Sequence, residues 1–135
     1  VGEIMASIKH QFIIDCVIRK MRDMAFEPVC LEGKSTLIGA LKIPPKIIRH
    51  RPDIIGVNKN YKMCIGEAKT NNDINSKRTK EQLIDYFQSD CLTIIGCPIS
   101  CYYALNNLIK KVVPNQQLIS ILKVPDELMP NDNEV

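Results

Sequence analysis

Two short apolar runs near the middle of this 135-residue chain, Pro52–Val57 and Tyr61–Thr70, constrain its fold more than any other feature. Only three residues separate them, Asn58, Lys59 and Asn60. Isoleucine, valine and aromatic residues are typical of strands, and asparagine is typical of turns. The pattern therefore predicts two neighbouring strands joined by a tight turn.

The second run carries two ionisable residues inside an otherwise apolar strand. Side chains alternate between the two faces of a strand, so Glu67 and Lys69 share one face and Ala68 points to the other. Met63 and Ile65 precede them on the same face. Buried charges are costly unless they are paired or bind a metal, so this pair predicts a site rather than ordinary surface.

A third ionisable residue, Asp53, lies on the preceding strand, and its position depends on the turn. A three-residue loop centred on Asn60, with Asn in a left-handed conformation, would place Asp53 opposite Glu67 on the same face. A two-residue turn at Lys59 and Asn60 would shift the register by one and place Asp53 on the opposite face.

Two carboxylates beside an ammonium group form a small site of oxygen ligands. Mg²⁺ prefers one or two carboxylates and keeps part of its water shell, and the backbone carbonyl of Ala68 could add a third oxygen to Asp53 and Glu67. Such a cation activates water and neutralises charge on a phosphodiester. Lys69 would orient the attacking water and stabilise the transition state. The alternative is a surface strand with a salt bridge.

The remaining pattern predicts an α/β (α+β) fold with a mixed central sheet flanked by helices, in the order αβββαβαβ. Residues 1–124 should form a single domain. The double proline at 44–45 excludes a helix or central strand there. Besides the hairpin, the predicted elements are helices at 3–25, 76–89 and 100–112 and strands at 26–32, 91–96 and 117–124.

The charge is distributed unevenly along the chain. The last eleven residues, 125–135, hold four acidic and no basic residues, which predicts a mobile acidic tail. Residues 1–124 hold 18 basic and 11 acidic residues, a net charge of +7. The stretch 33–52 contains no acid, which suits a polyanion such as DNA, although a solvated loop explains it equally well. Its candidate nucleic-acid contacts are Lys34, Lys42, Lys46, Arg49 and Arg51.

Six cysteines and the absence of a long apolar run bear on the compartment. No signal-like segment is visible and most cysteines sit in apolar runs, so we expect reduced thiols in an intracellular protein, cytoplasmic or nucleoid-associated. No run reaches the ~18 apolar residues of a membrane span, so no membrane partner is expected. Cys91, Cys97 and Cys101 match no cluster signature well, and core thiols are the favoured interpretation.

The residues of the predicted site resemble a known superfamily. Pro52-Asp53, followed after thirteen residues by Glu67-Ala68-Lys69, resembles the signature of the PD-(D/E)XK, restriction-endonuclease-like nucleases. Gln82 and Tyr86 are similar to the QxxxY motif of the RecB-like branch and share one helix face. The resemblance spans about Ile8 to Cys97. It implies Mg²⁺ or Mn²⁺ bound by Asp53 and Glu67, a catalytic Lys69 assisted by Gln82, and Tyr86 facing the site or DNA.

The first helix departs from the superfamily pattern, in which many members carry an acidic residue near the metal. His10 or Gln11 occupies the matching position here, and Glu3 and Asp15 are less well placed. Gln82 also has a second interpretation. Residues 79–82, Thr-Lys-Glu-Gln, fit a capping box in which Gln82 folds back on the start of its helix.

The resemblance implies a metal-dependent nuclease that hydrolyses phosphodiester bonds in DNA, in repair, recombination or restriction. In size the chain is similar to archaeal Holliday-junction resolvases, which suggests a homodimer, because two active sites are needed to cut two strands. The alternative is a catalytically inactive nucleic-acid-binding or assembly module of the same fold.

Overall fold

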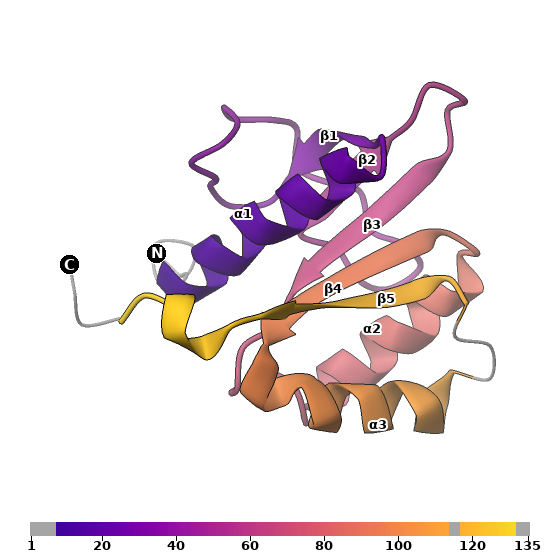
Figure 1. The fold of residues 1–135 in the computed structure, drawn as a ribbon. Helices are drawn as coiled ribbons and strands as arrows, with labels where there is room; N and C mark the ends of the chain where they lie inside the picture. The colour runs from indigo at the N-terminus through magenta and orange to yellow at the C-terminus, as the bar shows by residue number, and fades with distance from the viewer. Residues whose placement is uncertain (1–7, 114–116, 132–135) are drawn as a thin grey trace.

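A computed structural model describes residues 8–113 and 117–131 as one sheet with helices on both faces (Figure 1). The strands are β1 (Glu27–Leu31), β2 (Ile54–Val57), β3 (Met63–Ala68), β4 (Leu92–Pro98) and β5 (Ile119–Val124). The α-helices are α1 (Ile8–Asp23), α2 (Lys77–Gln88) and α3 (Tyr102–Val112). Two 3₁₀ helices, η2 (Ile99–Cys101) and η3 (Asp126–Leu128), complete the described elements.

The predicted α+β class with a mixed sheet is confirmed. The element order differs from the prediction by the two 3₁₀ helices, whose single turns are too short to produce a periodic pattern. The first helix ends at Asp23 rather than Ala25, because Ala25 adopts a left-handed conformation with φ 68°. The predicted helix residues before position 8 lie outside the described residues.

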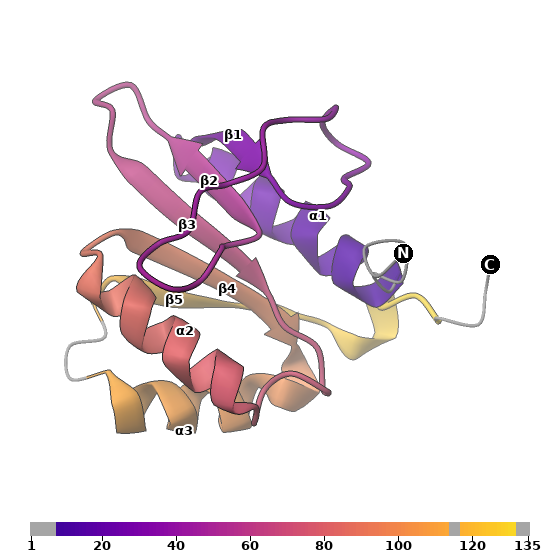
Figure 2. The same cartoon turned by 180° about the vertical axis from the view of Figure 1, so that it is seen from behind.

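The sheet follows the chain order, β1-β2-β3-β4-β5. β1, β2 and β3 pair antiparallel, whereas β3, β4 and β5 pair parallel. The helices α2 and α3 provide the long connections that parallel neighbours require. α1 covers one face of the sheet, and α2 and α3 cover the other (Figure 2).

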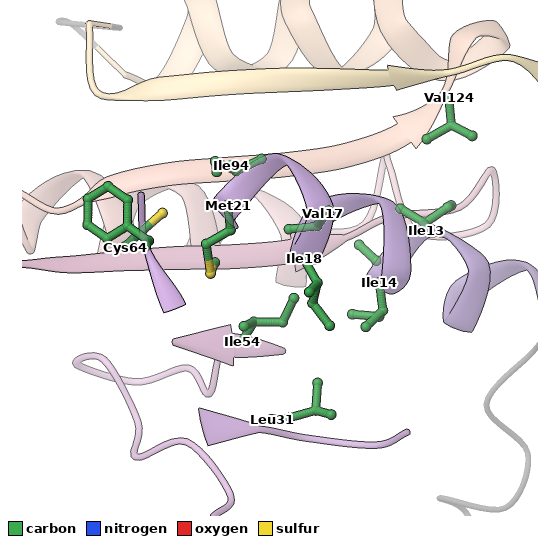
Figure 3. Packing of buried hydrophobic residues seen from close by; sticks show 12 residues of the cluster. Ile13, Ile14, Val17, Ile18, Met21, Leu31, Ile54, Cys64, Ile94 and Val124 are labelled. Carbon is green, nitrogen blue, oxygen red and sulfur yellow. The ribbon is translucent and has the colours of Figure 1, made fainter. Parts of the chain in front are cut away.

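The core under α1 explains why this helix lies close to the sheet (Figure 3). Its apolar residues recur with helical spacing and form one buried stripe. Two glycines face that stripe. A Cβ on Gly96 would lie 2.7 Å from Ile13 Cγ2, and one on Gly66 would lie 3.0 Å from Val17 Cγ1. Glycine at both positions therefore permits the close approach of helix and strands. The buried residues of the stripe are Ile13, Ile14, Val17, Ile18 and Met21.

The turn between β2 and β3 decides the register of the candidate site. Asn58 N–H donates to Lys62 O at 3.1 Å, so the loop contains three residues centred on Asn60. The left-handed residue is Tyr61 (φ 63°), which corrects the expectation that an asparagine would adopt this conformation. Asn58 instead uses its Oδ1 to accept hydrogen bonds from the N–H groups of Asn60 and Lys62. The observed pairing of Ile54 with Gly66 places Asp53 next to Glu67.

Two peripheral segments are held against the domain. Asp15 accepts hydrogen bonds from Ser35 and Thr36, which anchor the start of the basic stretch to α1. Within the stretch expected to be a mobile tail, Asp126 lies in η3 and accepts hydrogen bonds from the N–H and Oγ of Ser100. Asp126 is therefore held against the start of η2, and residues 132–135 lie outside the described residues.

Candidate active site

Asp53 and Glu67 meet where β2 begins and β3 ends. The backbone N–H of Asp53 donates to Glu67 Oε1 at 3.1 Å, and the N–H of Ala68 donates to Asp53 Oδ2 at 2.9 Å. These reciprocal bonds fix both carboxylates relative to the strands. Only 3% of Glu67 is exposed, and 14% of the Asp53 side chain is. The interpretation of Glu67 as part of an exposed surface strand is therefore wrong.

Lys69 directly follows the last residue of β3 and, like Glu67, is buried. Its ammonium donates to Gln82 Oε1 at 2.5 Å and lies 3.8 Å from Glu67 Oε2. Tyr86, one helical turn beyond Gln82, donates its hydroxyl to Glu67 Oε1 at 2.9 Å. The two residues of the helix motif thus hold the two charged residues of the strand.

The capping interpretation of Gln82 is wrong. Ser76 is the N-cap of α2, and its side chain accepts from the N–H of Thr79 at 3.1 Å. Gln82 lies well inside the helix, where it contacts Lys69. Tyr86 is 1% exposed and points at Glu67, so its placement fits the predicted orientation toward the site and not the alternative contact with DNA.

The electrostatics of the site are unfavourable to two negative charges. Burial, and next the charge of Asp53, raise the pKa of Glu67 well above its ordinary value, although Lys69 and the Tyr86 hydroxyl act in the opposite direction. Burial and the neighbouring Glu67 likewise raise the pKa of Tyr86, which keeps its hydroxyl a donor. The site would therefore gain from a cation placed between the two carboxylates.

The first helix contributes His10 to the site. His10 Nε2 lies 3.4 Å from Asp53 Oδ2, and this hydrogen-bond partner raises the pKa of the imidazole against the opposing effect of burial. Gln11 is half-buried on α1 and does not line the hollow formed by the site residues. Asp15 is engaged with Ser35 and Thr36, so it does not supply the missing acid, and Glu3 lies outside the described residues.

His10, Asp53, Glu67, Lys69 and Gln82 line an open hollow of about 170 Å³. Sequence reasoning missed several of its members. Arg78 precedes Gln82 by one helical turn, and this spacing was a signal that could have placed it on the same face of α2. The other lining residues that were not anticipated are Glu32, Asp73 and Ser76. Apart from Ala68, the lining residues of the hollow are therefore polar or charged.

The oxygen atoms of the hollow fit a small, hard cation. Both carboxylates line the hollow, and Glu67 Oε2 lies 3.8 Å from Lys69 Nζ. Ala68 lines the hollow beside them. Among residues 8–113 and 117–131, no group of three or more His, Cys, Asp or Glu side chains is placed to hold a metal. Two carboxylates with a partial water shell are the arrangement that Mg²⁺ favours over an all-protein cage.

The five basic candidates have different environments. Arg51 lines the hollow, lies 3.5 Å from Glu32 and donates to the carbonyl of Pro44. Arg49 is directed away from the hollow, toward Asp85 and Glu81 of α2. The three lysines are exposed and do not line the hollow, namely Lys34, Lys42 and Lys46.

A buried carboxylate on α2 anchors the basic stretch, and sequence reasoning missed it. Asp85 is 1% exposed. Its carboxylate accepts hydrogen bonds from the backbone N–H of Arg49 at 3.0 Å and from Arg49 Nη2 at 2.8 Å, and it also contacts His50 Nδ1 at 2.7 Å. Burial alone would raise the pKa of Asp85, but the hydrogen bonds from Arg49 and His50 lower it. The cluster holds the chain that leads into Asp53 against the helix that carries Gln82.

The cysteines and the helices complete the description. All six cysteines are free, and burial raises the pKa of Cys64 and Cys97 to about 12. Among the helices of the described ranges, none combines the length and the apolar character needed to cross a membrane.

The comparisons with known proteins give no relative. No protein-family model matches the chain, and neither a curated protein nor a solved structure is significantly similar to it. Any functional interpretation therefore depends on the geometry of Asp53, Glu67 and Lys69 and on the motifs that they resemble.

Proposed function

We propose that this chain is a metal-dependent nuclease of the PD-(D/E)XK type that hydrolyses phosphodiester bonds in DNA. One observation carries the proposal. Asp53, Glu67 and Lys69 line a single hollow, with Lys69 held by Gln82 and Glu67 held by Tyr86. A titratable group with a perturbed pKa and a specific charged partner, located in a hollow, is typical of functional sites.

Each residue has a distinct role in the proposed reaction. Asp53 and Glu67 would hold Mg²⁺ or Mn²⁺ with the carbonyl of Ala68. When bound, the cation lowers the pKa of water and neutralises charge on the phosphodiester. Lys69 orients the attacking water and stabilises negative charge that develops on the phosphate. Tyr86 and Gln82 act as positioning residues, because they reach the reaction through Glu67 and Lys69.

The motif pair also supports a restriction-endonuclease-like core as the fold assignment. In the structure Asp53 immediately precedes β2 and Glu67 lies on the adjacent β3, and the helix of Gln82 and Tyr86 follows, as the resemblance implies. DNA is the proposed partner, and Arg51 and Arg78 line the hollow together with Lys69, where they could contact a bound phosphate. A homodimer would supply the second active site needed to cut both strands. Repair, recombination and restriction are all compatible settings.

A catalytically inactive nucleic-acid-binding or assembly module is the second candidate. The observation that favours it is His10, which stands where many superfamily members have an acid and contacts Asp53. An imidazolium at this position would compete with a cation for the same carboxylate. The intact pairing of Lys69 with Gln82 opposes this candidate, because a binding module has no use for a buried ammonium.

The decisive test is cleavage of labelled single-stranded, duplex and four-way-junction DNA in Mg²⁺, Mn²⁺ or EDTA. The nuclease should cut at least one substrate with metal and none in EDTA, and Asp53→Ala should abolish cutting. An inactive module should bind the same DNA with unchanged affinity after Asp53→Ala and cut none of it. Binding is measured by fluorescence anisotropy on the same substrates, so both candidates are judged from one set of proteins.

A further inference from the structure

A second hollow lies beside the candidate active site and has a volume of about 400 Å³. It opens at the carboxyl ends of the parallel strands, since Pro98 ends β4 and Thr70 follows β3. Ligands of open α/β sheets commonly bind at this edge. The volume falls in the range of small-molecule sites and is more than twice that of the active-site hollow.

The two hollows share a boundary. Lys69 lines the active-site hollow and Thr70 lines the second one. On α1, His10 lines the active-site hollow and its neighbour Lys9 lines the second one. The boundary is rigid near Thr70, because its N–H and hydroxyl both approach Asp73 Oδ2, at 3.4 and 3.2 Å. The two hollows therefore adjoin along the chain, where Lys69 is followed by Thr70.

The lining combines apolar surface with separate donors and acceptors. Pro98 and Met129 supply apolar surface. Asn71 Oδ1 is occupied by the Cys101 thiol, so the side-chain NH₂ of Asn71 remains to donate. The Asn72 side chain has no hydrogen bond within the described ranges. Such a lining satisfies a planar, polar-edged group better than it satisfies a purely apolar one.

We propose that the second hollow holds an unpaired nucleobase of the DNA strand whose phosphodiester lies in the active-site hollow. This inference rests on the proposed nuclease function and names its substrate class, DNA with an unpaired nucleotide beside the cleaved bond. The asparagine amides and Asp126 face the polar edge of the base, since amides and carboxylates pair with base edges. Pro98 and Met129 pack against its apolar surface.

The lining of this hollow does not favour a second phosphate, because it contains the carboxylate of Asp126 as well as the ammonium of Lys9. Asp126 lines it, and the Asp126 carboxylate is held in place by two hydrogen bonds from Ser100. A fixed carboxylate repels a phosphate but accepts hydrogen bonds from the exocyclic amine of a base. The strand backbone therefore remains at the active-site hollow, where Arg51 and Arg78 lie, and the base turns into the second hollow.

The test compares a normal base with an abasic site. Duplexes with a short single-stranded extension are prepared with one abasic nucleotide, moved stepwise through the junction. Binding in EDTA is measured by fluorescence anisotropy for the wild type, Asn72→Ala and the control Asn107→Ala, an exposed amide on α3 that does not line the hollow. The wild type and the control should lose about tenfold in affinity at one abasic position, and Asn72→Ala should lose little there.

Two results would overturn the inference, and cleavage of the same duplexes in Mn²⁺ separates them. The nucleobase site is overturned if the affinity is equal at every abasic position, or if Asn72→Ala and the control lose the same affinity at an abasic position. Metal-dependent cutting of the same duplexes would still support the proposed nuclease. Absence of both binding and cutting overturns the inference together with the proposed function.

Discussion

Replacing Glu67 by glutamine should stabilise the metal-free protein, although it removes a central residue of the proposed site. In the folded chain burial and the charge of Asp53 raise the Glu67 pKa well above its ordinary value of about 4.5. The folded state therefore binds the Glu67 proton more tightly than the unfolded state does. Stability should be highest below about pH 4.5 for this group and fall as the pH rises toward the raised pKa.

The size of the effect follows from the contacts. Glutamine keeps an oxygen that accepts from Asp53 N–H and the Tyr86 hydroxyl, and its amide removes the repulsion toward Asp53. Each unit by which folding raises the Glu67 pKa, up to the pH of the measurement, lowers the free energy of unfolding by about 1.4 kcal/mol. Relief of one buried, poorly compensated charge is typically about 1–3 kcal/mol. For a domain of this length the Glu67→Gln variant should gain about 3–10 °C in Tm in EDTA at pH 7.5.

Thermal unfolding of the wild type, Glu67→Gln and the exposed control Glu127→Gln tests this reasoning at pH 5 and pH 7.5, in EDTA and in Mn²⁺. The gain of Glu67→Gln over the wild type should shrink at pH 5, and Mn²⁺ should raise the Tm of the wild type and the control only. A Glu67→Gln protein that is less stable than the wild type in EDTA would refute the electrostatic argument. Equal stabilisation of all three proteins by Mn²⁺ would refute the metal assignment.

Three further predictions concern the supports of the site and the core. Tyr86→Phe removes a donor to the buried glutamate and should weaken Mn²⁺ binding about tenfold by calorimetry; unchanged affinity would exclude a positioning role. Gly96→Ala places a methyl group against α1 and should cost about 1–3 kcal/mol of unfolding free energy in urea, and no loss would contradict the close packing. Iodoacetamide at pH 8 should spare Cys64 and Cys97, whose pKa is about 12, and modify the half-buried Cys30 in the native protein, as judged by mass spectrometry.

Strand periodicity predicted only part of the centre of the site. Alternation along one strand placed Glu67 and Lys69 on a common face, whereas the position of Asp53 depended on the turn, and the structure has the register that places Asp53 next to Glu67. The conformation within the loop was not predictable from composition. Asn58 is used as an acceptor at the start of the loop, so the left-handed position falls to Tyr61.

Contacts between distant segments explain what sequence reasoning missed. Asp85 and Arg49 are 36 residues apart, and neither local propensity nor periodicity links a carboxylate on a helix to a loop arginine. The contact between Asp126 and Ser100 was missed for the same reason. An acidic segment is expected to be solvated, and the sequence does not show that the start of η2 lies close enough to donate hydrogen bonds to Asp126. Helix spacing did bring Gln82 and Tyr86 to one face, but only the structure shows that this face contacts Glu67 and Lys69.

Single-turnover cleavage by Lys69→Ala is the most direct test of the central claim. The matched control is Lys80→Ala, an exposed lysine on α2, and all proteins are assayed with the best DNA substrate in Mn²⁺ after equal binding is confirmed. Lys69→Ala should lose at least about 100-fold in rate with the control unchanged, because the proposed role of Lys69 is to stabilise the transition state. Equal rates for both variants, or no cutting by the wild type in any metal, would contradict the proposed nuclease.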